Sequence, residues 1–241
     1  MRRARGLWSR GGSGKERAFR MDEAAVVRGL IEAYRAGVFP MAGPGGGVGW
    51  YDPDPRGIIP IDRADPAGGF CVPRSVRARV RRGAFEVTSD RAFGEVIRAC
   101  AAPRAGQAEW EAWIDGRIVA AYEALHRAGH AHSVEAWGVT GGERVLVGGL
   151  YGVTVGGLFA GESMFHRADR GGSGASKVCL VHLVAHLRRR GYVLLDTQMV
   201  TPVIELMGGV EIPRAEYKER LAHAAGMGVE WGEFVADRMD A

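Results

Sequence analysis

Apolar residues recur along the chain at two different intervals, and each interval predicts its own kind of element. Between residues 90 and 100, apolar side chains fall at i, i+3, i+4 and i+7, which places them on one face of a helix. Similar spacing predicts further helices at residues 22–37, 73–83, 115–128 and 176–190, from Thr201 to Gly208, and from Pro213 onward. The expected N-caps, which have side chains able to accept a hydrogen bond from the first turn, are Asp22, Asp90, Asp115 and Thr201.

Extended apolar runs predict the strands. AFEVT, at residues 84–88, is the first; AHSVEAWGV, RVLVGGLYGVTV and GLFAGESMF follow as a meander with turns at Gly141-Gly142 and Gly156-Gly157. YVLLDTQ, at residues 192–198, is nearly all apolar before its last residues, which indicates a buried strand. The order of elements predicts an α/β fold with a mixed sheet, similar to N-acetyltransferases (GNAT-like), after a small N-terminal part.

The domain organisation follows from this order and from the Gly- and Pro-rich residues 41–60. That segment, MAGPGGGVGWYDPDPRGIIP, is expected to be a loop, because its prolines and glycines disfavour a helix or a central strand. The predicted division is a basic flexible tail at 1–20, a small N-terminal domain at 21–65 and a GNAT-like catalytic domain at 66–241.

Composition excludes several classes of protein. Of 241 residues, 46% are hydrophobic and 25% charged, enough to bury a large core, and no apolar run approaches the ~18 residues of a membrane span. Three scattered cysteines without a Cys-x-x-Cys pair argue against a zinc ribbon or a disulfide framework. With no apolar signal segment at the start, the expected location is the cytoplasm.

The net charge of +4 is unevenly distributed. Residues 1–20 carry seven basic residues and one acidic residue, whereas residues 22–241 carry 25 basic and 27 acidic residues. The tail is expected to be disordered, with a non-specific nucleic-acid arm as the functional alternative. Within the slightly acidic body, residues 74–82 stand out with five arginines and no acid, which suggests a polyphosphate partner, although a solvated helix face is the ordinary explanation.

Two polar groups at strand ends are candidates for chemistry. Glu162, in Gly161-Glu162-Ser163, could act as an acid, a base or an amine-binding group, although a solvated strand-end carboxylate is the commoner outcome. Asp196 and Gln198 end a buried strand, where ligands of α/β sheets commonly bind. A buried Asp could orient the Gln carbonyl towards an amine, but capping of a neighbouring backbone is the commoner role of such an Asp.

Two other patterns suggest ligands less strongly. Residues 170–176, RGGSGAS, open a helix and could bind a phosphate or form a flexible linker. Ser173 stands where acyl-CoA enzymes of this fold carry their first glycine, which weakens a CoA interpretation. His130 and His132 alternate on a strand, but no third ligand is near in sequence, so no metal and no cofactor are expected.

Several stretches together resemble the leucyl/phenylalanyl-tRNA–protein transferase family. In order, they are AYRAGVFP, WYDPDPRGIIP, AFGEVIRACA, WIDGRIVAAYEALHRAGHAHSVEAW, LVGGLYGV, LFAGESMF, ASK, LLDTQ and EIPRAEY. The resemblance extends from about Tyr34 to Tyr217 and is most specific from His130 to Phe165. The chain departs from the family pattern at Met41, where a Trp is usual, and after Gln198, where a His-containing run is absent.

The resemblance implies the transfer of Leu or Phe, and Met as a further candidate, from aminoacyl-tRNA to the N-terminal amine of proteins that begin with Arg or Lys. This transfer marks the acceptor for N-degron degradation. It implies Glu162, Asp196 and Gln198 as catalytic residues, in a monomer without a membrane partner. The residues expected to bind the donor side chain are apolar. They are Trp50, Trp113, Leu150, Phe159 and Met164, which are expected on loops or sheet ends, and Leu180 in the helix predicted at 176–190.

The basic helix is the predicted tRNA contact, through Arg74, Arg77, Arg81 and Arg82. Two alternatives remain at this point. One is an acyl-CoA N-acyltransferase of the same fold, and the other is a tRNA-binding relative that has lost catalysis.

Overall fold

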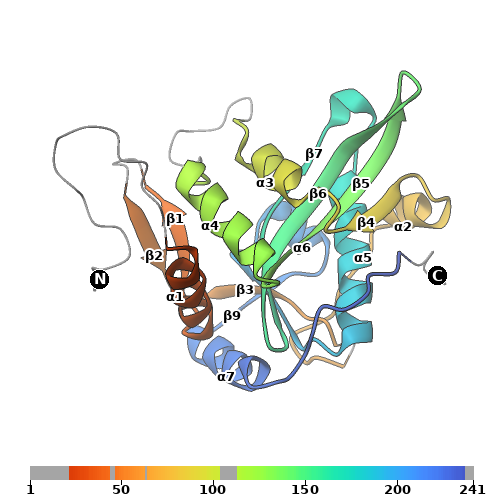
Figure 1. The fold of residues 1–241 in the computed structure, drawn as a ribbon. Coiled ribbons are helices and arrows are strands. Elements are labelled where there is room, and N and C mark those ends of the chain that lie inside the picture. Colours follow the sequence, from red (N-terminus) through yellow and green to blue (C-terminus); the bar gives the residue numbers. More distant parts are fainter. Residues whose placement is uncertain (1–21, 44–46, 63, 104–112, 237–241) are drawn as a thin grey trace, which may run out of the picture.

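In the computed structural model, which describes residues 22–43, 47–62, 64–103 and 113–236, one large mixed sheet is covered on both faces by helices (Figure 1). Its strand order is β4-β5-β6-β7-β8-β3-β9, and a separate two-stranded sheet pairs β1 with β2. The strands are β1 (Phe39–Ala42), β2 (Val48–Tyr51), β3 (Arg56–Ile59), β4 (Glu86–Ser89), β5 (Ala131–Thr140), β6 (Glu143–Val155), β7 (Leu158–His166), β8 (Leu194–Gln198) and β9 (Val210–Ile212).

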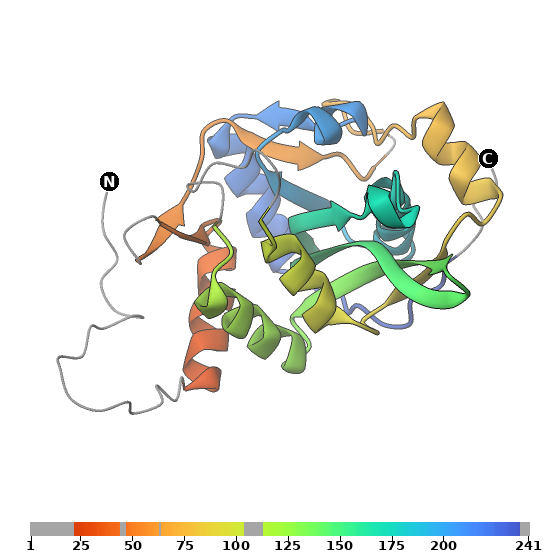
Figure 2. The same cartoon turned by 90° about the horizontal axis from the view of Figure 1, so that it is seen from above.

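The helices divide between the two faces of the sheet. They are α1 (Glu23–Arg35), α2 (Arg74–Arg81), α3 (Phe93–Ala101), α4 (Gly116–Arg127), α5 (Ala175–Arg190), α6 (Pro202–Leu206) and α7 (Arg214–Ala225), with a 3-10 turn, η2 (Ala168–Arg170). Apolar side chains of α1, α3, α4 and α7 share one core cluster, and those of α2 and α5 share the other. Figure 2 shows α1 and α4 side by side, with the β1–β2 hairpin beside them.

The predicted fold class is confirmed. From β4 onward the order is strand, two helices, three antiparallel strands, helix, strand, helix, a short strand and a helix. The three meander strands pair antiparallel, and among the described strands only β7 and β8 pair in parallel. Asp22, Asp115 and Thr201 cap their helices as predicted, each accepting a backbone N–H of the first turn.

The prediction of a loop at residues 41–60 is wrong. Residues 39–42 and 48–51 form strands β1 and β2 of a two-stranded sheet, where both strands are edges and the missing N–H of Pro40 is tolerated. Residues 56–59 form β3 inside the large sheet, between β8 and β9. Gly57 permits this position because a Cβ there would lie 2.6 Å from the carbonyl carbon of Met199.

Two local expectations also differ from the structure. Asp90 does not cap α3, whose N-cap is Ala92 without a side-chain bond. Instead, Asp90 adopts a positive φ of 57° and accepts hydrogen bonds from the backbone of Ser133 and from the ring of His132. Strand β9 was not predicted, because three residues are too few to show a period.

The N-terminal part shares its core with the rest of the chain. Val26, Leu30 and Tyr34 of α1 pack into the same cluster as α3 and α4, and β3 lies in the large sheet although the predicted domain boundary follows it at residue 65. The predicted tail at 1–20 lies outside the described residues. Within the part of the chain that the structure describes, no helix has the length and apolar character needed to cross a membrane.

Candidate active site

The candidate site lies where the parallel strands β7 and β8 part. Their pairing ends at Ala160 opposite Asp196, although β7 continues to His166. Glu162 and Gln198 each follow this last pair by two residues. Each strand also contains one extra residue here, because Glu162 has no partner on β6 and Thr197 has none on β3. Such bulges redirect side chains and are common beside active sites.

Asp196 is fully buried and held by an array of donors. Arg56 donates from Nε to Oδ1 at 2.9 Å and from Nη2 to Oδ2 at 2.7 Å, a two-pronged pair. Tyr217 donates its hydroxyl to Oδ2 at 2.9 Å, and the backbone N–H of Gln198 donates to Oδ1, also at 2.9 Å. Asp196 therefore fixes the backbone of Gln198, whereas the sequence suggested a contact with its side-chain amide.

Gln198 has a positive φ, and the Nε2 of its side chain is available to bind a ligand. Its φ of 60° lies in the left-handed region, which a residue other than glycine adopts only when its surroundings hold it there. Only 6% of the residue is exposed, yet its Nε2 has no hydrogen-bond partner among the described residues. A buried amide nitrogen without a partner is costly, so the geometry suits a ligand that accepts from it.

Glu162 faces a pair of tyrosines. Tyr34 on α1 donates to Oε1 at 2.7 Å, and Tyr122 on α4 donates to Oε2 at 3.0 Å. The two hydroxyls also contact each other. Glu162 is only partly exposed, and both of its carboxylate oxygens are held, so its position is fixed by side chains from two helices.

Burial raises the pKa of Glu162 to about 7, and the negative charge of Asp196 acts in the same direction. The hydroxyls of Tyr34 and Tyr122 and the charge of Arg56 oppose this rise. Glu162 is thus near the midpoint of its titration at neutral pH, where a group can both take and give up a proton.

Arg56 links the site to the N-terminal part. Burial acts to lower the pKa of Arg56, but its bonds to Asp196 outweigh that and raise it. Its Nη1 donates to the carbonyl of Gly37 at 3.0 Å, and its guanidinium stacks on the ring of Tyr217 at 4.3 Å. A buried charge with this many partners stays ionised.

The six predicted pocket residues divide between the two core clusters. Trp50 and Trp113 pack against the cluster that contains α1, α3 and α4. The other four belong to the cluster around α5. Three of them, expected on loops or sheet ends, lie in strands β6 and β7, and the fourth lies in α5, where a helix was expected. They are Leu150, Phe159, Met164 and Leu180. Their role in binding stays a prediction.

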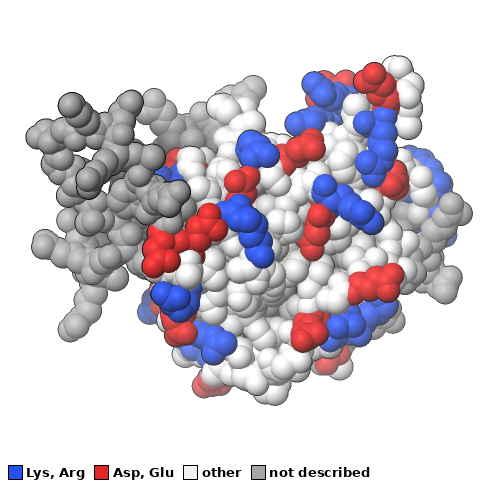
Figure 3. All heavy atoms as spheres, in the orientation of Figure 1, with Lys and Arg blue, Asp and Glu red and all other residues white. Residues whose placement is uncertain are grey.

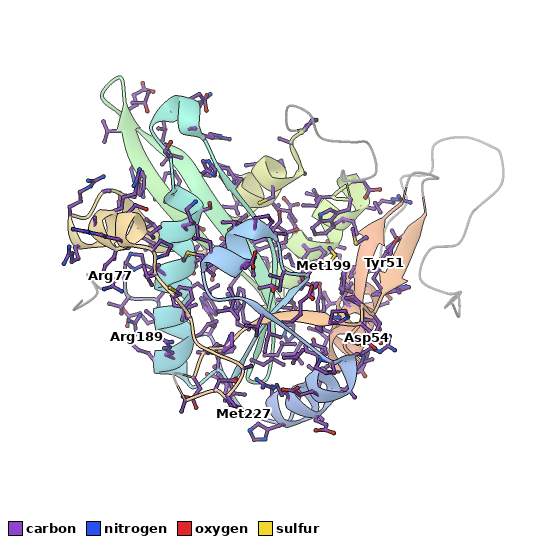
Figure 4. The ribbon with its side chains drawn as sticks, turned by 180° about the vertical axis from the view of Figure 1, so that it is seen from behind. Tyr51, Asp54, Arg77, Arg189, Met199 and Met227 are labelled. Atoms are coloured by element: carbon purple, nitrogen blue, oxygen red, sulfur yellow. The ribbon has the colours of Figure 1, made fainter. Side chains whose placement is uncertain are left out.

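The predicted tRNA contact forms an exposed helix face. Arg74, Arg77, Arg81 and Arg82 are exposed on α2 and the residue after it, while Arg79 turns inward to the carbonyl of Ser173 at 3.1 Å. Figure 3 shows basic side chains at the edge where α2 lies, and mixed charges over much of that face. In Figure 4, Arg77 lies well apart from Met199, the residue after Gln198.

The other patterns have structural explanations. His132 donates from Nδ1 to Asp90 Oδ2 at 2.8 Å, and its ring stacks on Trp231 at 4.3 Å. In the segment at 170–176, the amides of Gly171, Gly172 and Ala175 already donate to carbonyls of the same turn, which leaves fewer for a phosphate. Among the described residues, no three His, Cys, Asp or Glu side chains gather in a way that could hold a metal ion.

Sequence reasoning missed half of the site. It gave no role in the site to Arg56 or to the three tyrosines Tyr34, Tyr122 and Tyr217. For Arg56 the sequence contained an indication of its role. It is a charged residue directly before residues 57–59, which are apolar, and a charged residue beside a buried segment usually has a partner. For the tyrosines no such indication exists, since their helical spacing fits a core position equally well.

Comparison with known proteins adds an independent finding. The family model for leucyl/phenylalanyl-tRNA protein transferase matches residues 66–222, and the model for the N-terminal domain of the same enzyme matches residues 27–54. A solved structure, a tandem GNAT protein from the clavulanic acid biosynthesis pathway without AcCoA, is similar with a TM-score of 0.37 and 14% identity, over 81% of this chain and 68% of that chain.

Three curated proteins, all with the name leucyl/phenylalanyl-tRNA–protein transferase, are similar over most of their length. The protein of Rubrobacter xylanophilus is 51% identical over 195 residues, which cover 81% of this chain and 92% of the relative. That of Gluconobacter oxydans is 48% identical, over 84% of each chain. That of Salinibacter ruber is 47% identical, over 84% of this chain and 81% of the relative.

Proposed function

The chain belongs to the leucyl/phenylalanyl-tRNA–protein transferase family, and on this basis we propose that Glu162, Asp196 and Gln198 form the site at which it transfers an amino acid from aminoacyl-tRNA to a protein. The donors are Leu-tRNA and Phe-tRNA. The acceptor is the α-amine of a protein that begins with Arg or Lys, and the product is a substrate for N-degron degradation. The basic face of α2 binds the tRNA.

The reaction is the aminolysis of an ester. The neutral amine nitrogen attacks the ester carbonyl carbon, a C–N bond forms, and the C–O bond to the ribose of the terminal adenosine breaks. The amine loses one proton and the ribose oxygen gains one, so the atoms balance without a further reactant. The protein has to align the two substrates and stabilise the negative oxygen of the tetrahedral intermediate.

The proposed roles follow from what each side chain can donate or accept. Gln198 accepts a hydrogen bond from the attacking amine through Oε1 and donates through Nε2 to the carbonyl oxygen as it becomes negative. Asp196 keeps Gln198 in its left-handed backbone conformation by accepting its N–H. Glu162, as a carboxylate, binds the cationic group of the acceptor.

One observation carries this proposal: the buried Nε2 of Gln198 has no hydrogen-bond partner in the part of the chain that the structure describes. It belongs to a residue whose backbone is fixed by a buried, fully bonded Asp196, at the end of the parallel strand pair. An acyl transfer needs a pre-aligned donor of this kind, because a donor that must reorganise during the reaction stabilises the oxyanion less. A lapsed tRNA-binding protein would have no need to maintain such an unsatisfied group.

An acyl-CoA N-acyltransferase is the second candidate. Against it stand Ser173 in place of a glycine and the amides of residues 171, 172 and 175, which are used within their own turn. Binding of CoA, measured by calorimetry, distinguishes the two candidates, because a transferase that uses only aminoacyl-tRNA has no CoA site.

The direct test is a transfer assay. Radiolabelled Leu-tRNA is incubated with the protein and with peptides that differ only in their first residue. We expect label on peptides that begin with Arg or Lys and none on a peptide that begins with Asp. Label that stays on tRNA in every reaction, with the tRNA nevertheless bound, would support the catalytically lapsed alternative.

The basic face of α2 gives a first testable prediction. Replacing Arg77 and Arg81 by Ala should weaken the binding of Leu-tRNA and Phe-tRNA equally, because phosphate contacts carry no sequence information. Each lost contact should lower the slope of log K against log salt concentration by somewhat under ~1. Transfer from a short aminoacyl-adenosine donor, which does not reach α2, should hardly change. Filter binding at several salt concentrations measures the first effect, and the transfer assay measures the second.

A matched control removes the same charge elsewhere. Arg28 and Arg35 are exposed on α1, which Figure 1 places on the opposite side of the molecule from α2. Their replacement by Ala should leave the salt slope unchanged. If the Arg77/Arg81 variant instead lost activity on the short donor to the same extent, the face would have a structural role and not a tRNA-binding one.

A further inference from the structure

The C-terminal turn of α1 contacts Glu162 directly and also contacts Arg56, which binds Asp196. We propose that this turn, from Tyr34 to Gly37, is a positioning element: it holds Glu162 directly through the Tyr34 hydroxyl and holds Asp196 indirectly through Arg56. The inference rests on the proposed function of the site and adds to it residues that lie in the N-terminal part of the chain.

The direct contact is from Tyr34 to Glu162. Tyr34 is 2% exposed, and its hydroxyl contacts Tyr122 and Glu162 Oε1, the latter at 2.7 Å. These residues are 128 positions apart in the sequence. A hydrogen bond to a carboxylate in such surroundings is stronger than in water, so the loss of this one donor would both release Glu162 and change its affinity for a proton.

The indirect contact passes through Arg56. Gly37 follows Ala36, the C-cap of α1, and its carbonyl accepts from Arg56 Nη1 at 3.0 Å. The other two nitrogens of Arg56 bind Asp196, and Asp196 in turn binds the backbone of Gln198. The turn therefore sets the position of the guanidinium that holds the second carboxylate.

The turn is itself fixed from outside. Gly37 has a φ of 74°, which glycine adopts without strain and which reverses the chain into β1. On the outer side, Lys218 of α7 donates to the carbonyl of Ala36 and pairs with Asp52 at 3.2 Å. A displacement of this turn would therefore disturb Glu162 and Asp196 together. A helix end without contacts to the site would disturb neither.

The experiment uses the pH dependence of transfer. The groups that face Glu162 are Tyr34 of α1, Tyr122 of α4, Tyr151 of β6, Asp196 of β8 and Arg56 of β3. As a carboxylate, Glu162 is active above its pKa, so kcat/KM should fall as the pH drops through about 7. The acceptor amine adds its own titration, which is the same for every variant.

The acidic limb is the part of the pH profile in which kcat/KM falls as the pH drops. Tyr34→Phe removes one hydrogen-bond donor that lowers the pKa of Glu162, so this limb should move to higher pH by roughly one unit. The rate at pH 7 should fall about fivefold, from the smaller anionic fraction, and recover at pH 9. The affinity for tRNA should not change. A merely structural tyrosine would lower the rate equally at all pH values, and that result would overturn the proposal.

Tyr151→Phe is the matched control. Tyr151 is fully buried in the same cluster and packs against Tyr122, but its hydroxyl has no partner among the described residues. Loss of the Tyr151 hydroxyl should leave the acidic limb unchanged.

Lys218→Met is a second variant that affects the turn, and Lys218 lies outside the buried cluster. It should move the acidic limb in the same direction as Tyr34→Phe, but by less. No shift in either turn variant would contradict the proposal.

A second measurement separates this inference from the proposed function. The carboxyl carbon of Glu162, labelled with ¹³C and assigned with Glu162→Gln, can be titrated by NMR without any substrate. If the protein has no transfer activity but Tyr34→Phe still raises the pKa of Glu162, the proposed function is wrong and the positioning role of Tyr34 stands. If the protein is active but Tyr34→Phe does not change that pKa, the positioning role is wrong and the proposed function stands.

Discussion

Gln198→Asn should slow single-turnover transfer by ~10²-fold, with little change in the affinity for aminoacyl-tRNA. Asn tolerates the left-handed conformation that residue 198 adopts, at a φ of 60°, so the backbone and its bond to Asp196 are retained. The side chain is shorter by one methylene, which withdraws the amide from the reacting atoms by more than ~1 Å, and a displacement of that size can cost ~10²-fold. Rapid-quench measurement with saturating enzyme gives the rate directly.

The control for this variant is Thr197→Val. The neighbouring Thr197 has a buried Oγ1 without a partner among the described residues, and Val has nearly the same shape. Its transfer rate should stay within about twofold of the unmodified protein. Equal rates in Gln198→Asn and Thr197→Val would remove Gln198 from the mechanism.

Arg56→Met should lower the free energy of unfolding by ~3–5 kcal/mol, which is the usual effect of removing one partner of a buried ion pair. The change leaves the carboxylate of Asp196 in the core with two donors among the described residues, the Tyr217 hydroxyl and the Gln198 N–H. It also removes the donor to the Gly37 carbonyl. Urea unfolding with an unchanged m-value measures the loss.

A double-mutant cycle tests whether the pair itself is responsible. Asp196→Asn alone leaves Arg56 buried with only the more distant carboxylate of Asp52, at 3.9 Å, among the described residues, but the double variant removes both charges of the Arg56–Asp196 pair. The double variant should therefore be more stable than the sum of the single effects predicts, by more than ~1 kcal/mol. Additive effects would mean that Arg56 acts through packing on Phe39 and Tyr217 and not through Asp196.

The sequence by itself determined the helices, the strands from β4 to β8 and the family. Apolar spacing fixed the helices and the meander, because each of these depends on a local period and on nearby caps and turns. The strings around Glu162 and Asp196-Thr197-Gln198 were specific enough to imply the family and three candidate residues. Chemistry-bearing residues that stand next to one another in sequence could be recognised without knowledge of the fold.

The tertiary structure alone decided how those residues are held and where they point. The bulge at Glu162 shifts the register between β6 and β7, and period-two counting along β7 cannot reveal such an insertion. Arg56 was assigned to a loop because its segment contains prolines and glycines, yet it lies in the large sheet and binds Asp196, 140 residues away. Tyr34 looked like an ordinary core residue of α1. Contacts between residues this far apart depend on how the sheet and helices pack, and no local pattern in the sequence records that packing.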